Sequence, residues 1–60
     1  MIGKKFKILK GRGKGKEILV RDKGLNLWTK NIWSVEYVKS GEQDAFYHHE
    51  LLENCELLDN

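Results

Sequence analysis

Proline is absent from the 60 residues, and Cys55 is the only cysteine. A single cysteine excludes both an intramolecular disulfide and a cluster of thiolate metal ligands, which stabilise many small secreted folds. No apolar run approaches the roughly 18 to 20 residues that cross a bilayer, and the residues after Met1 alternate between basic and apolar. We therefore expect no membrane association, a reducing cytoplasmic location and a core held together by packing alone.

The chemistry of an enzyme is also poorly represented. The composition, 40% hydrophobic and 33% charged, is that of one ordinary globular domain over residues 1–60. A chain this short has little room for a water-excluding pocket, and it offers no paired carboxylates and no nucleophile with a base. His48 and His49 are adjacent, so their rings do not converge easily on one metal. We expect a protein without catalytic activity, metal or cofactor.

Charge is unevenly distributed along the sequence. Residues 1–30 contain ten basic and two acidic side chains, a charge of +8, whereas residues 31–60 contain one basic and seven acidic side chains, a charge of −6. The two halves can neutralise each other across a small fold. Alternatively, because each sign is confined to one contiguous half, one face stays positive and attracts polyanions.

Two extended segments flank a glycine-rich stretch in the basic half. Residues 5–10 and 17–21 alternate between polar and apolar, the period of half-buried strands. Their inward-facing side chains are expected to be Phe6, Ile8, Ile18 and Val20. Between them, residues 11–16 read Gly-Arg-Gly-Lys-Gly-Lys, and alternate glycines disfavour regular structure and permit turns with positive φ. The pattern predicts a basic loop that joins two strands.

A second pair of strands is predicted further along the chain. Residues 25–31 form a long loop with room for a short strand, and residues 32–38 have the strongest strand composition in the sequence. The face expected to be inward holds Trp33, Val35 and Tyr37, with Trp33 in the core. Residues 39–43 are typical of a hairpin connection with Gly41 in the left-handed region, and residues 44–48 form the returning strand.

Residues 44–59 fit two structures. They contain no glycine or proline, and their apolar spacing suits an amphipathic helix, which would give a sheet with a C-terminal helix, an α+β fold. Alternatively, residues 48–52 form a 3₁₀ turn, and residues 55–58 form a closing strand. We favour the second structure, a mainly β fold in which the strands make a small antiparallel barrel.

Residues 7–20 read Lys-Ile-Leu-Lys-Gly-Arg-Gly-Lys-Gly-Lys-Glu-Ile-Leu-Val. This stretch resembles the KOW motif of bacterial ribosomal proteins and NusG-type transcription factors, in which an apolar strand and a glycine lead into a basic turn ending Lys-Gly-Lys and a second strand. The rest of the chain looks like an SH3-like or Tudor-like barrel, with an aromatic third strand, a tight hairpin and a 3₁₀ turn. Domains of this kind bind RNA, DNA or proteins, so the resemblance leaves the function open.

The leading functional hypothesis is a non-enzymatic module that binds the phosphate backbone of RNA or DNA. Alternate glycines would expose backbone N–H groups to phosphate, and the basic side chains would add charge-assisted donors. Trp28 would stack on a base or sugar. The residues expected to contact nucleic acid are Lys10, Arg12, Lys14, Lys16, Trp28 and Lys30.

The alternative hypothesis is a protein-interaction module, such as a small phage or accessory protein that docks on a larger host protein. Its contacts would come from aromatic and acidic positions, and the basic loop would only aid solubility. These positions are Trp28, Tyr37, Glu42, Asp44 and Tyr47. The sequence leaves the oligomeric state open.

Overall fold

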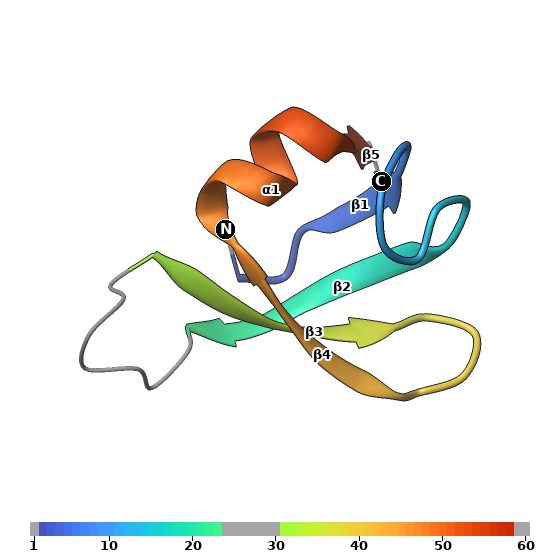
Figure 1. Cartoon of the computed structure of the whole chain (residues 1–60). Helices are drawn as coiled ribbons and strands as arrows, with labels where there is room; N and C mark the ends of the chain where they lie inside the picture. The colour runs from blue at the N-terminus through green and yellow to red at the C-terminus, as the bar shows by residue number, and fades with distance from the viewer. Residues whose placement is uncertain (1, 24–30, 59–60) are drawn as a thin grey trace.

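A computed structural model of the chain describes residues 2–23 and 31–58. These residues form five strands and one helix in the order β1 (Lys5–Ile8), β2 (Glu17–Lys23), β3 (Ile32–Tyr37), β4 (Gln43–Tyr47), α1 (His48–Asn54) and β5 (Cys55–Leu58). The strands form a single antiparallel sheet in the order β4-β3-β2-β1-β5, and α1 connects its two edge strands (Figure 1).

The predicted mainly β fold is confirmed, but closure of the sheet into a barrel is not. Within the described residues β4 and β5 are edge strands, and no ladder joins them. The sheet is nevertheless curled. Arg12, which follows β1, donates a hydrogen bond to the carbonyl of Ala45 on β4, although β2 and β3 separate these strands in the sheet. A side chain therefore joins parts of the curled sheet that strand pairing does not.

The core lies on the concave face of the sheet and under α1. Its buried side chains come from every strand and from the helix, namely Phe6, Ile8, Ile18, Val20, Val35, Phe46, Leu51 and Cys55. Trp33 and Tyr37 are partly buried and pack against this cluster. The predicted inward faces of β1, β2 and β3 are thus confirmed, because apolar residues at every second position reach the same side of a strand.

The expected 3₁₀ turn at residues 48–52 is wrong, because α1 is a seven-residue α-helix over His48–Asn54. Glu50 turns back to accept a hydrogen bond from the backbone N–H of Tyr47, with 2.9 Å between Oε1 and the nitrogen. Leu51 is fully buried in the core. A satisfied N-terminal amide and a buried apolar side chain favour a full helical turn over a 3₁₀ turn.

The strand predicted at residues 55–58 is confirmed as β5, which pairs with β1 from Ile8↔Cys55 to Lys5↔Leu58. It is an edge strand and does not close the sheet into a barrel. The competing helix over residues 44–59 is wrong, since its first residues belong to β4 and its last to β5. The β3–β4 hairpin is also confirmed, with Gly41 at φ 75°. Most of the predicted long loop, residues 25–30, lies outside the described residues.

Candidate nucleic-acid interface

The glycine-rich stretch folds as an ordered loop between β1 and β2, as the sequence predicts. We call residues 10–16 the basic loop. Ile8 and the loop exchange backbone hydrogen bonds, from Ile8 N to Lys16 O at 2.9 Å and from Gly15 N to Ile8 O at 2.8 Å. The φ angles of the three glycines in the loop are positive, between 76° and 90°. The chain therefore turns sharply while β1 and β2 stay in register.

The sequence predicts that the backbone N–H groups of this loop are free to bind phosphate, but several of them are bonded within the chain. Lys14 N donates to Gly11 O at 3.2 Å, and Lys16 N donates to Gly13 O at 2.9 Å. Together with the bond from Gly15 N, three consecutive amides are satisfied inside the chain. The expectation that exposed N–H groups cradle a phosphate is wrong for these three positions, where only side chains are left to bind an anion.

Gly13 is the tightest point of the loop. A Cβ atom at this position would lie 2.9 Å from Ile8 Cδ1 and 3.3 Å from the hydroxyl oxygen of Tyr37. Its φ of 76° is also unfavourable for other residues. Only glycine lets the loop fold down onto β1 and β3.

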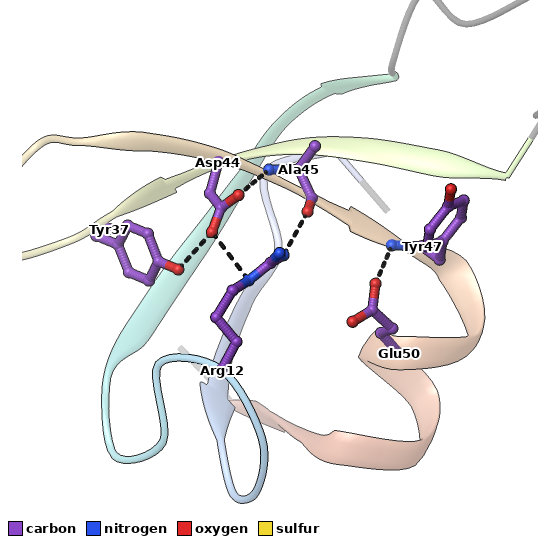
Figure 2. A network of polar contacts seen from close by, with 6 residues as sticks. All are labelled: Arg12, Tyr37, Asp44, Ala45, Tyr47 and Glu50. Atoms are coloured by element: carbon purple, nitrogen blue, oxygen red, sulfur yellow. Dashed lines mark hydrogen bonds and ion pairs between the residues drawn. The ribbon is translucent and has the colours of Figure 1, made fainter.

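Arg12 attaches the basic loop to β4 (Figure 2). Its Nε lies 3.3 Å from Asp44 Oδ2, and its Nη2 donates to the carbonyl of Ala45 at 2.7 Å. The guanidinium also covers the ring of Phe46, 4.6 Å from the centroid. The sequence assigns Arg12 to phosphate contact, whereas the structure shows two of its nitrogens engaged within the chain. We call Arg12, Asp44 and Tyr37 the latch.

Tyr37 completes the latch by donating its hydroxyl hydrogen to Asp44 Oδ2 at 2.6 Å. The other carboxylate oxygen, Oδ1, accepts the backbone N–H of Ala45 at 2.7 Å. Partial burial by itself raises the pKa of Asp44, but the hydrogen bonds from Tyr37 and Ala45 and the charge of Arg12 outweigh it and lower the pKa overall. Burial and the bond to Asp44 raise the pKa of Tyr37 to about 12.

The lysines of the basic loop are exposed and differ from Arg12 in having no acidic partner. Within the described ranges, 2–23 and 31–58, no ion pair involves Lys10, Lys14 or Lys16. The ammonium of Lys16 lies 5.1 Å from the centroid of the Tyr37 ring, a cation–π contact that leaves most of its donors free. The loop thus presents to solvent three lysines that form no ion pair with any described residue.

Lys39 was missed by the sequence reasoning. It is exposed and belongs to the connection between β3 and β4. This connection lies on the same side of the molecule as the basic loop (Figure 1). The two connections border a hollow of about 260 Å³, which we call the hairpin groove, lined by Gly15, Lys16, Glu17, Tyr37, Val38, Lys39 and Ser40. The only signal in the sequence was that Lys39 is the sole basic residue of the acidic half.

Two of the predicted nucleic-acid contacts, Trp28 and Lys30, lie outside the described residues. Of the positions predicted for a protein partner, Trp28 is likewise outside, and Tyr37 and Asp44 are bonded to each other. Glu42 and Tyr47 are exposed, and the ring of Tyr47 stacks on that of His49 with 5.5 Å between centroids. Of the four that are described, Tyr47 pairs with Ile32 at one end of the β3–β4 ladder, whereas Glu42 and Asp44 lie toward the other end.

The part of the chain that the structure describes offers little for metal binding, thiol chemistry or membrane insertion. No group of three or more histidine, cysteine, aspartate or glutamate residues could hold a metal ion there. Burial, and to a lesser degree the charge of Glu50, raises the pKa of Cys55, so its thiol stays protonated within the core. Among these residues, no helix has the length and apolar character required to span a membrane.

Comparisons of the chain with models of known families, with curated proteins and with solved structures found no match. The resemblance of residues 7–20 to the KOW motif and of the whole chain to SH3-like barrels stays a prediction.

Proposed function

We propose that this chain is a non-enzymatic cytoplasmic module that binds nucleic acid through its phosphate backbone. The observation that carries the proposal is the set of three exposed lysines on one ordered loop, Lys10, Lys14 and Lys16, none of which has an acidic partner in the described structure. Phosphate neutralised by such lysines releases condensed counterions, which favours association without any base contact.

The latch supports this proposal because it fixes the loop without consuming those lysines. Arg12 pairs with Asp44, so the carboxylate that contacts the loop from β4 is compensated internally. A loop anchored at its centre also loses less conformational entropy when a ligand immobilises it. The glycines between the basic residues keep the surface free of other bulk, so that a nucleic-acid strand can approach closely.

The proposal predicts the salt dependence of binding. Logarithms of the association constant for a labelled single strand, plotted against the logarithm of salt concentration, should give a steep negative slope. The double variant Lys10→Ala, Lys14→Ala should flatten that slope by about 1.4, since each lost phosphate contact on a single strand removes about 0.7. Fluorescence anisotropy at several salt concentrations measures the slopes.

The matched control is the double variant Lys4→Ala, Arg21→Ala. It removes the same charge from exposed positions outside the basic loop, and its slope should stay close to that of the native chain. Equal flattening in both variants would show that only net charge matters, and undetectable binding by the native chain would reject the proposed function. A ligand retained from lysate after nuclease treatment would favour a protein partner instead.

A further inference from the structure

We propose that the hairpin groove binds one phosphodiester group of the nucleic-acid strand, between Lys16 and Lys39. This inference rests on the proposed function and deepens it, because it adds a contact from the acidic half of the sequence. The groove has about 260 Å³ of volume between the basic loop and the β3–β4 connection. Lys16 comes from the first of these and Lys39 from the second.

The ammonium groups of Lys16 and Lys39 form no ion pair within residues 2–23 and 31–58. Lys16 is placed over the ring of Tyr37, which lines the same groove. Two like charges bordering one hollow repel each other, and an anion between them removes that repulsion.

Ser40 adds a hydrogen-bond donor to the groove. Its Oγ accepts the backbone N–H of Glu42 at 3.2 Å, which leaves the hydroxyl hydrogen to donate elsewhere. The backbone of the β3–β4 connection is held in place, since Gly41 N donates to Tyr37 O at 2.8 Å and Val38 N donates to Glu17 O at 3.0 Å. The donor is therefore held in a stable connection instead of having to be ordered by the ligand.

The volume of the groove indicates which part of a nucleic acid it accepts. Pockets that enclose a drug-sized ligand measure roughly 300 to 1,000 Å³, and this groove is smaller. It fits a phosphate with part of its sugar, in a strand that continues over the surface. The Tyr37 ring already carries the ammonium of Lys16, so base stacking is not expected there and binding should depend little on sequence.

Glu17 also lines the groove and opposes an anion there. Lys7 lies opposite it in the β1–β2 ladder, and no ion pair joins the two among the described residues. This arrangement supplies a variant of the opposite sign, since Glu17→Gln removes a negative charge from the groove and should raise the affinity.

The test measures the salt slope for a labelled homopolymeric single strand with the full chain and three single variants. Lys16→Ala and Lys39→Ala should each flatten the slope by about 0.7, and Glu17→Gln should tighten binding. Lys4→Ala is the matched control, because Lys4 is an exposed lysine at the end of β1 away from the basic loop. Thermal unfolding of each variant checks that the fold is retained.

The possible failures are distinguishable. If Lys39→Ala behaves like Lys4→Ala while Lys10→Ala and Lys14→Ala flatten the slope, the groove is not a phosphate site and the proposed function survives. If the native chain shows no salt-dependent binding, both proposals are rejected. If affinity differs strongly among homopolymers, the backbone-only reading of the groove is overturned.

Discussion

At the scale of single residues, the most informative side chain is Arg12, whose guanidinium bonds to two groups on β4 and covers an aromatic ring. The planar guanidinium offers five N–H donors, and two of its nitrogens meet Asp44 and the carbonyl of Ala45. Lysine has no such fork and could not make the same set of contacts. Arg12 therefore positions the basic loop, whereas the neighbouring lysines are exposed to solvent.

The latch predicts that stability depends on pH in the acid range. The folded pKa of Asp44 lies below its ordinary value of 3.8, so the unfolded chain binds this proton more tightly. The stabilisation is complete above the ordinary pKa and is lost as pH falls through the lower folded value. Asp44→Asn should cost about 1 kcal/mol near neutral pH, and that difference should shrink in acid.

Urea unfolding of both proteins across the acid range measures this difference. The side chain of Asp44 is 27% exposed, so solvent screening keeps the expected cost modest. A difference between the two proteins that stays constant down to strongly acid pH would contradict the role given to Asp44.

Gly13 allows a second prediction at this scale. Gly13→Ala places a Cβ 2.9 Å from Ile8 Cδ1, which forces the loop or β1 to shift. Gly15→Ala is the matched control, because Gly15 also has positive φ but has nothing within 4 Å of the added atom. Backbone strain is common to both variants, so Gly13→Ala should be the less stable by about 1 to 3 kcal/mol. Equal unfolding free energies would show that the loop is not held against β1.

The exposure of a side chain could be predicted from the sequence more readily than its bonding partners. The exposure of Lys10, Lys14 and Lys16 follows from their place in a polar, glycine-rich loop. The engagement of Arg12 does not, because Ala45 is 33 residues away in the chain and only the curl of the sheet brings them together. The role of Lys39 likewise depends on two hairpins meeting on one side of the molecule.

At the scale of elements, α1 shows why the spacing of apolar residues alone could not predict the secondary structure around residue 48. The hydrophobic spacing over residues 44–59 fits one long helix, yet the chain is strand, helix and strand in turn. Phe46 lies opposite Trp33 on β3, and Cys55 lies opposite Ile8 on β1. Tertiary pairing thus overrides helical propensity at both ends and leaves α1 seven residues long.

On the side of β4 away from β3, three backbone groups are hydrogen-bonded to side chains instead of to another strand. The N–H of Ala45 is bonded to Asp44 and its carbonyl to Arg12, and the N–H of Tyr47 is bonded to Glu50 (Figure 2). Groups that are already bonded offer no template to another strand. These three groups of β4 are therefore not free to pair with another strand.

Glu50 gives the prediction at this scale. Glu50→Ala removes the acceptor of the Tyr47 N–H and should destabilise the protein by about 0.5 to 2 kcal/mol, the usual effect of losing a helix cap. Glu53→Ala is the control, since Glu53 is an exposed acid in the same helix and should change stability by less than about 0.5 kcal/mol. Denaturant unfolding compares them, and equal losses would contradict the capping role.

At the scale of the whole molecule, the two charged halves of the sequence are partly interleaved and partly kept apart. On β1, Lys7 lies between Glu17 of β2 and Glu56 of β5 in the sheet registers, so opposite charges face each other across those strands. The basic loop projects beyond the strands, and its lysines have no such neighbours in register. The asymmetry predicted from the sequence therefore persists at the loop and is reduced over the sheet.

The most direct test of the account is a titration of the isotopically labelled chain with a homopolymeric single strand, followed through backbone amide resonances. We predict that the amides shifting most belong to the basic loop and to residues 38–40 of the β3–β4 connection, and that added salt reverses the shifts. Shifts confined to α1 and β5, or no shifts at low salt, would contradict it.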